Sequence, residues 1–257
     1  MAFLSSLLLA VLAAVTPVTL PPAGGVADYQ LGGAYRPAAK VDIVVRDRTE
    51  KPAPGVYSVC YVNAFQTQPG TLRWWKKKHP GLLLRDAKGR VVRDAGWPDE
   101  VLLDLRSARK RAVAAKVMRR WFASCADRGF KAVEPDNLDS WTRSGKLLKR
   151  SQARAYAKRL VTAAHAEGLA IAQKNTADLN GRKLGFDFAV AEECEVYREC
   201  GRYTKMYGRR VIEIEYSDNG RKAFKRACKA RGAKASVLLR DRDVVPRGEK
   251  GYVYRTC

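Results

Sequence analysis

The sequence predicts an α/β fold in which parallel strands alternate with helices. Eight short apolar segments rich in strand-forming residues are centred near residues 29, 43, 59, 133, 171, 188, 213 and 237. In the later two-thirds of the chain these segments alternate with stretches of helical periodicity, as in βα units. Eight is the strand number of a (β/α)8 TIM-type barrel, and an open doubly wound sheet shows the same alternation.

Individual elements are predicted from their own residues. The clearest early strand covers residues 56–63, which are rich in Val and Tyr. Ser107 is a good N-cap for a helix over about residues 108–128. A second helix opens at Ser151 and ends at Gly168, because glycine favours a helix C-terminus. Later helices are expected near residues 195–207 and 221–231.

The length and the N-terminus together predict one exported domain. A chain of 257 residues is long enough for one barrel or for two smaller domains. Residues 1–15 are an uncharged apolar run, which is too short for a comfortable membrane span and typical of a secretory signal. We expect residues 1–27 to hold a signal peptide and short leader, cleaved between about Ala14 and Ala27, and residues 28–257 to form the mature domain. No membrane span is expected.

The cysteines predict disulfides. Their number is even, no Cys-x-x-Cys pair is present, and the chain has an apparent export signal, so disulfides are favoured over zinc. The expected pairs are Cys194 with Cys200, Cys228 with Cys257 and, by elimination, Cys60 with Cys125, and the alternative for the last pair is two buried free thiols.

A short apolar run within residues 129–141 breaks at Pro135 into acids and amides. Proline cannot donate to a sheet ladder, so strand pairing is expected to stop there. Asp136, Asn137 and Asp139 would then lie on the loop beyond the strand. Polar groups just past the C-terminal ends of parallel strands are where α/β sheets keep their chemistry.

Residues 186–195 have the same form, an apolar run that opens into Glu192, Glu193 and Glu195. Two strands tipped with carboxylates indicate one shared site. Paired carboxyl groups can act as an acid and a nucleophile or base, which is the requirement of glycoside hydrolysis. The alternative is that these acids only cap the helices that follow.

The sequence resembles glycoside hydrolase family 114, the endo-α-1,4-polygalactosaminidases. The resemblance implies a single (β/α)8 barrel as the catalytic domain. It also identifies Asp136, in Glu134-Pro-Asp-Asn, and Glu192, in Ala191-Glu-Glu-Cys, as the catalytic pair; the second motif reads Asn-Glu-Gln-Cys in the family. The similar segments follow one another in order and are residues 28–33, 59–63, 103–107, 129–139, 164–169, 173–175, 186–194, 197–200 and 215–216.

The resemblance implies a secreted, endo-acting glycoside hydrolase that cleaves an α-1,4-linked polymer of galactosamine or N-acetylgalactosamine. We expect a retaining mechanism with Asp136 as nucleophile and Glu192 as general acid and then base; if the enzyme inverts, Asp136 is the base. Glu134 and Asp139 are the alternatives to Asp136 in this role. The alternative is a secreted, non-catalytic barrel that binds sugar or an anionic cell-wall polymer.

Polar and aromatic residues at the predicted strand ends are candidates for substrate binding. Amide side chains can form hydrogen bonds with sugar hydroxyls, and aromatic rings can stack on sugar rings. For Asn63 the alternative is a loop contact, and for Lys174 it is a structural salt bridge inside the barrel. Residues 68–100 form a long insertion, which is expected to act as a lid or binding wall. The candidates are Tyr29, Gln30, Asn63, Asn137, Asp139, Lys174, Asn175, Glu215 and Tyr216.

The chain carries a net charge of +23, with 49 Lys and Arg against 26 Asp and Glu. Such a charge suggests nucleic acid, but the bases are scattered over helix faces and no nucleic-acid motif is present, so no specific nucleic-acid partner is expected. A solvated shell that adheres to anionic wall polymers is favoured. Residues 187–218 concentrate acids, which predicts an acidic cleft inside the basic shell.

The charge also bears on the substrate. Polygalactosamine is cationic, so a basic surface would repel it at low salt. One hypothesis is that the natural polymer is wholly or partly N-acetylated, or is presented on an anionic cell surface. The histidines His79 and His165 have no partner at a metal-ligand spacing, so no metal or other cofactor is expected. We expect a monomer.

Overall fold

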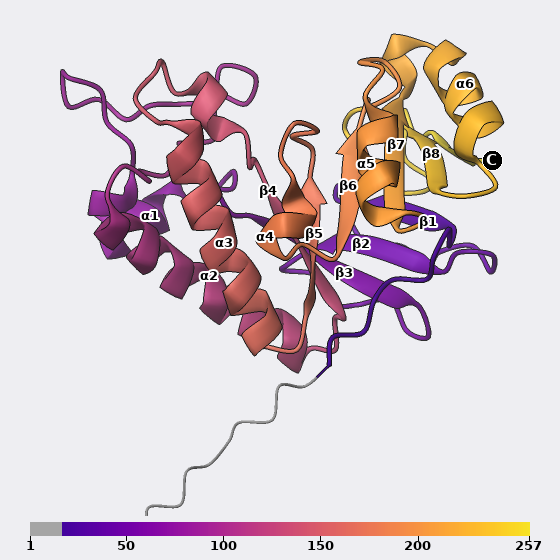
Figure 1. The fold of residues 1–257 in the computed structure, drawn as a ribbon, viewed down its shortest axis with the longest axis horizontal. Coiled ribbons are helices and arrows are strands. Elements are labelled where there is room, and N and C mark those ends of the chain that lie inside the picture. The colour runs from indigo at the N-terminus through magenta and orange to yellow at the C-terminus, as the bar shows by residue number, and fades with distance from the viewer. Residues whose placement is uncertain (1–16) are drawn as a thin grey trace, which may run out of the picture.

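The computed structural model describes residues 17–257, and most of the expected signal peptide, residues 1–16, lies outside them. Nine strands form one sheet in chain order, in which β1 to β8 are parallel and β9 is antiparallel to β8 (Figure 1). The first eight coincide with the eight predicted strands. The strands are β1 (Ala27–Gln30), β2 (Ile43–Asp47), β3 (Tyr57–Asn63), β4 (Ala132–Asp136), β5 (Ala170–Lys174), β6 (Phe188–Glu192), β7 (Val211–Tyr216), β8 (Ser236–Arg240) and β9 (Tyr254–Thr256).

The helices follow β3 and the later strands. The Ser107 hydroxyl accepts from the backbone N–H of Lys110 and caps α2, as predicted. Among residues 17–257, the connections before β3 contain no helix, so the outer layer of the barrel is incomplete on that side. The helices are α1 (Leu72–Lys78), α2 (Ala108–Asp127), α3 (Arg150–Ala166), α4 (Gly181–Leu184), α5 (Cys200–Tyr207) and α6 (Lys222–Arg231), with short 3-10 turns at Pro80–Leu82, Ser140–Arg143 and Ser217–Asn219.

The barrel is closed at its seam by side chains. In the part of the chain that the structure describes, strand pairing runs from β1 to β9 and does not return to β1. The Ser236 hydroxyl accepts from the backbone N–H of Ala27 at 2.9 Å. Arg240, which is buried, donates to the backbone carbonyl of Tyr29 at 2.8 Å. These contacts join β8 to β1, and the architecture is the expected TIM-type barrel.

The prediction that strand pairing stops at Pro135 is wrong for one neighbour. β4 pairs with β5 only through Ala132 and Val133, but its pairing with β3 continues to Asp136, which lies opposite Asn63. Proline lacks an N–H but keeps its carbonyl acceptor, so it removes a bond on one side only. Asp136 is therefore the last residue of the strand, which fixes its backbone to the sheet.

The apolar core has two main parts. Small and branched residues such as Val45, Ala172 and Ile214 fill the barrel interior, and a larger cluster lies between the sheet and helices α2, α3 and α5. Trp75 is fully buried, with Trp74 and Trp121 beside it at ring distances of 5.1 and 5.6 Å, so the three tryptophans pack together. This packed base supports the polar residues at the strand ends.

All three predicted disulfides are present in the structure. Two of them lie within the second half of the chain, and the third joins β3 to α2. The alternative of buried free thiols at the third pair is therefore wrong. The pairs are Cys60–Cys125, Cys194–Cys200 and Cys228–Cys257.

Candidate active site

A cavity of about 580 Å³ opens at the C-terminal ends of the strands. Its walls come from the ends of strands β1 to β7, from the long segment between β3 and α2, and from the loop after β8. Eight acids line it, against three basic residues. This confirms the expected acidic cleft. The acids are Asp47, Asp94, Glu100, Asp136, Asp139, Glu192, Glu193 and Asp243, and the bases are Arg143, Lys174 and Arg242.

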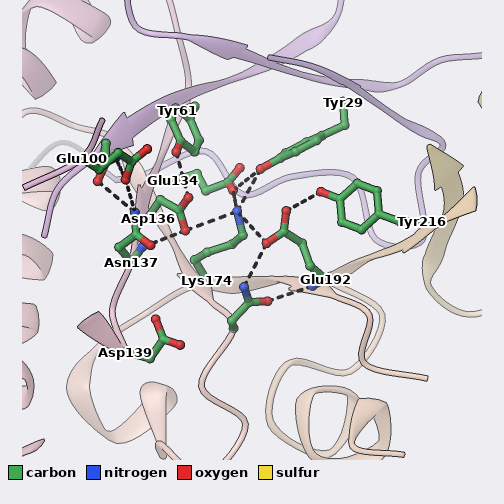
Figure 2. A network of polar contacts seen from close by, with 12 residues as sticks. Tyr29, Tyr61, Glu100, Glu134, Asp136, Asn137, Asp139, Lys174, Glu192 and Tyr216 are labelled. Carbon is green, nitrogen blue, oxygen red and sulfur yellow. Dashed lines mark hydrogen bonds and ion pairs between the residues drawn. The ribbon is translucent and has the colours of Figure 1, made fainter. Parts of the chain in front are cut away.

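Asp136 and Glu192 face one another across the floor of this cavity, at the ends of β4 and β6 (Figure 2). Tyr61 donates its hydroxyl hydrogen to Asp136 Oδ2 at 2.8 Å. Tyr216 donates in the same way to Glu192 Oε1 at 2.5 Å, and Asn175 Nδ2 donates to Glu192 Oε2 at 3.0 Å. Each carboxylate is thus held by donors from a neighbouring strand and keeps part of its surface in the cavity.

Lys174 lies between the two carboxylates (Figure 2). Its Nζ is 3.4 Å from both Asp136 Oδ1 and Glu192 Oε2, and it donates to Glu134 Oε1 at 2.7 Å. Both Lys174 and Glu134 are fully buried. Burial lowers the pKa of Lys174, but the carboxylates of Asp136, Glu134 and Glu192 outweigh this and hold its pKa well above the ordinary value. The ammonium therefore stays charged.

The position of Lys174 limits the distance between the two carboxylates. Asp136 Oδ1 and Glu192 Oε2 each lie 3.4 Å from the same nitrogen, so these two oxygens are at most 6.8 Å apart. Carboxyl groups about 5–5.5 Å apart are typical of retaining glycosidases, and about 6.5–9.5 Å of inverting ones. The bound concerns one oxygen of each carboxylate, so it shows that the two groups lie close together across the cavity, and both ranges are compatible with it.

Tyr29, on β1, forms hydrogen bonds with both Glu134 and Lys174. It donates its hydroxyl hydrogen to Glu134 Oε1 at 2.7 Å and accepts from Lys174 Nζ at 2.9 Å. Burial, and then the charge of Glu134, raise the pKa of Tyr29 well above its ordinary value. Glu134, Lys174 and Tyr29 thus form a buried unit beneath the partly exposed carboxylates of Asp136 and Glu192.

The residues just after three of these strands have a left-handed backbone, with φ of 66° at Asn137, 49° at Asn175 and 56° at Glu193. Residues other than glycine rarely adopt this backbone conformation, which costs of order 1–3 kcal/mol at each such position. The side chains are tied down in return: Asn175 Oδ1 accepts from the Glu192 N–H, and Arg242 donates twice to Glu193. Such strain is typical of sites where position matters more than local stability.

Six of the nine predicted substrate-binding residues line the cavity, and Gln30, Asn63 and Glu215 do not. Gln30 is buried with Asp28 and Arg46. Glu215 accepts from the backbone N–H of Glu195. Asn63 is buried behind Asn137 and accepts a hydrogen bond from it. The six lining residues are Tyr29, Asn137, Asp139, Lys174, Asn175 and Tyr216.

Several residues that build the site carry no motif of their own. Tyr61 lies within a predicted strand, and its alternation with Asn63 predicts that both point the same way. Arg143 donates to Asp94, Asp139 and Asn137, and so joins the long insertion to the loop after β4. No motif marks Arg143; only the expectation that residues 68–100 form a binding wall pointed to this region.

A barrel that directs two carboxylates into one cavity has the arrangement of a glycoside hydrolase. The sequence model of the glycoside-hydrolase family GH114 matches residues 9–257, so the chain belongs to this family and is a glycoside hydrolase. A comparison with curated proteins finds no match.

Solved structures show the same fold. Ega3 of Aspergillus fumigatus, in complex with galactosamine, has a TM-score of 0.73 and 23% sequence identity, covering 95% of this chain and 100% of that one. The glycoside hydrolase domain of PelA from Pseudomonas aeruginosa has a TM-score of 0.64 and 17% identity, covering 87% of this chain and 97% of that one.

Proposed function

We propose that this chain is a secreted, endo-acting glycoside hydrolase that cleaves an α-1,4-linked polymer containing galactosamine, with retention of configuration. The observation that carries the proposal is the pair Asp136 and Glu192 in an acidic cavity. The ammonium of Lys174 lies 3.4 Å from one oxygen of each carboxylate. An acidic cavity suits a polymer that bears free amines, and Ega3, which has the same fold, is described in complex with galactosamine.

In the first step, the ionised carboxylate of Asp136 attacks the anomeric carbon. The bond from that carbon to the leaving oxygen breaks, and Glu192 gives its proton to this oxygen. A glycosyl ester of Asp136 results. Tyr61 and Lys174 hold the attacking carboxylate in place, and Tyr216 and Asn175 hold the acid.

In the second step, the ionised Glu192 takes a proton from water while the water oxygen attacks the anomeric carbon. The ester bond breaks, Asp136 leaves as a carboxylate, and Glu192 is again protonated. Two inversions give net retention. The role of Lys174 in both steps is to hold the two carboxylates at a fixed spacing.

Export is supported by three disulfides and by the apolar N-terminal sequence, since disulfides persist in oxidising compartments. Among the helices of residues 17–257, none has both the length and the apolar character needed to cross a membrane. The monomeric state remains a prediction, which sedimentation would check.

The proposal is tested by measuring reducing ends released from partially N-acetylated α-1,4-galactosaminan. Asp136→Asn and Glu192→Gln are each expected to lose at least about 10³-fold in kcat, because each removes a group that acts on the reacting atoms. Asp127→Asn, at the exposed end of α2, is the matched control and keeps full activity. Binding without any release by the wild-type protein would favour a non-catalytic sugar-binding barrel.

The two roles are separated with an aryl glycoside that has a good leaving group. Glu192→Ala should still form the glycosyl ester from this substrate, because the leaving group needs no proton, and added azide should restore turnover with a glycosyl azide of retained configuration. Asp136→Ala should show neither effect. An inverted first product from the wild-type enzyme would overturn the retaining mechanism.

A further inference from the structure

Glu100 is a buried acid at the end of the long insertion, and it lines the cavity. Its side chain Oε2 accepts from Asn63 Nδ2 at 2.7 Å and lies 3.4 Å from Asn137 Nδ2. Only 7% of the residue is exposed. Among residues 17–257, no donor reaches its other oxygen, Oε1. Figure 2 shows Glu100 on the side of Asp136 that faces away from Glu192.

The other acids of the lining, apart from the catalytic pair, are already bound by donors or exposed. Asp243 lies exposed beside Arg242. Asp139 is bound by Arg143 and is partly exposed. Glu100 is thus the acid that combines deep burial with an oxygen left open to the cavity. The remaining bound acids are Asp47 with Thr49 and Gln68, Asp94 with Gln66, Gly96 and Arg143, and Glu193 with Arg242 and Asn219.

The chemistry of an amino sugar places its nitrogen near this oxygen. In galactosamine the amine is carried by C2, the carbon next to the anomeric carbon that Asp136 attacks. A group that recognises the amine must therefore lie beside the nucleophile. Asn137 directly follows Asp136, and its amide reaches both Asn63 and Glu100, so Glu100 is held at the nucleophile's side.

We propose that Glu100 binds the free ammonium group on C2 of the sugar whose anomeric carbon faces Asp136, and so selects galactosamine over N-acetylgalactosamine at that position. This inference rests on the proposed function, since it assigns a specificity-determining residue to the same site. An ammonium supplies the charged donor that Oε1 lacks. An acetamide is neutral and bulkier, and leaves the buried carboxylate without a counter-charge.

The electrostatics of the group support this assignment. Burial raises the pKa of the Glu100 carboxyl to about 7; the hydrogen bond from Asn63 opposes this, and the charges of Asp136 and Asp94 add to it. Arg143 lies near enough to lower it, but its guanidinium is bound to Asp94, Asp139 and Asn137. A carboxyl group so poorly compensated gains most from a bound cation.

The test compares Glu100→Gln with the wild type on two sets of oligomers, one fully deacetylated and one N-acetylated at the reacting sugar. Glutamine keeps the shape and can still accept from Asn63. We expect kcat/KM on the deacetylated oligomer to fall about 10- to 100-fold, as for a lost hydrogen bond to a charged group. On the acetylated oligomer the change should stay below about 3-fold. Glu249→Gln, an exposed acid outside the cavity lining, should change neither value.

Equal losses on both oligomers, or no loss on the deacetylated one, would overturn the role of Glu100. If the wild-type enzyme released nothing from either, the proposed reaction would fail, and binding would still test this residue. Binding is then measured by titrating each sugar and following the NMR resonances of cavity residues. The Kd for galactosamine should be about 10-fold lower in the wild type than in Glu100→Gln, and the Kd for N-acetylgalactosamine should be the same in both proteins. Equal Kd values for galactosamine would sink the inference on their own.

Discussion

The cavity and the outer helices of this barrel carry opposite charge. The cavity lining holds eight acids and three bases. Helices α1 to α6 together hold 23 Lys and Arg residues and one acid, Asp127. The net charge of +23 is therefore almost entirely a property of the helical layer, whose helices lie beside the later strands in Figure 1.

This difference shows why net charge is a poor guide to the ligand of a barrel enzyme. Charges on exposed helices are screened within about 8–10 Å at physiological salt, whereas charges in a partly enclosed cavity are screened much less. A cationic sugar inside the cavity responds mainly to the nearby acids. The acidic lining thus removes much of the reason to expect an acetylated substrate, although the degree of acetylation stays a prediction to be measured.

The largest expected effect is the loss of stability when the buried lysine beneath the cavity is removed, compared with removal of a lysine on an outer helix. Lys174→Met leaves Glu134 buried without its counter-charge, which should cost about 3–5 kcal/mol in the free energy of unfolding. Lys158→Met on the exposed face of α3 should change it by less than about 0.5 kcal/mol. Urea denaturation at pH 7 measures both variants. A loss below about 1 kcal/mol for Lys174→Met would mean that Glu134 takes up a proton and needs no partner.

A second comparison uses the pH dependence of stability and sets an acid of the cavity against an acid that is paired with basic residues at the start of α2. The pKa of Glu100 is raised to about 7 from its ordinary value of 4.5, chiefly by burial. Asp104 lies against the start of α2; burial raises its pKa, but hydrogen bonds from Arg106 and Lys110 prevail and hold it at about 2, below the ordinary 3.8.

The two acids should therefore act in opposite directions. The folded state holds the Glu100 proton more tightly, so this group lowers stability as pH rises from 4.5 to about 7, by about 3 kcal/mol at most. Asp104 adds about 2 kcal/mol above pH 3.8, which is lost as pH falls toward 2.

At pH 8, Glu100→Gln should thus be more stable than the wild type and Asp104→Asn less stable, as thermal unfolding over pH 3 to 8 would show. The stability slope between pH 4.5 and 7 should become shallower in Glu100→Gln without vanishing, because burial also raises the pKa of Glu215 to about 7. If Glu100→Gln were less stable at pH 8, the carboxylate would have a cationic partner in solution.

The strands could be predicted because their signals are local, and so could the two carboxylates that meet in the cavity, Asp136 and Glu192. Apolar runs ending in acids placed β4 and β6, and Ser107 and Gly168 placed the helix ends. The number of acids in residues 187–218 also predicted an acidic cleft, but not all of these acids contribute to it. Glu195 and Glu213 are bound by Arg231 of α6 on the outer side of the sheet and do not line the cavity.

What could not be predicted depends on contacts between distant segments. Glu100, Asp94 and Arg143 meet because an insertion of irregular structure folds over the end of β4, and no periodicity encodes that approach. The lack of a helix before β3 among residues 17–257, by contrast, agrees with the sequence, in which helical periodicity is confined to the later two-thirds of the chain. Side chains that act together in the cavity come from five or more strands and loops, and only tertiary structure assembles them.

The smallest expected effect concerns the helical layer itself. Raising ionic strength from about 0.01 to 0.15 M shortens the screening length from about 30 to 8 Å, which removes repulsion from the helices before it weakens attraction in the cavity. For a deacetylated polymer, kcat/KM should first rise a few-fold and then fall at higher salt. The double variant Arg154→Glu and Lys158→Glu, on the exposed face of α3, should raise kcat/KM about 2-fold at low salt only. A fully acetylated polymer should show neither change. A steady fall from the lowest salt upward would mean that the cavity alone governs the encounter and that the basic helices serve another partner.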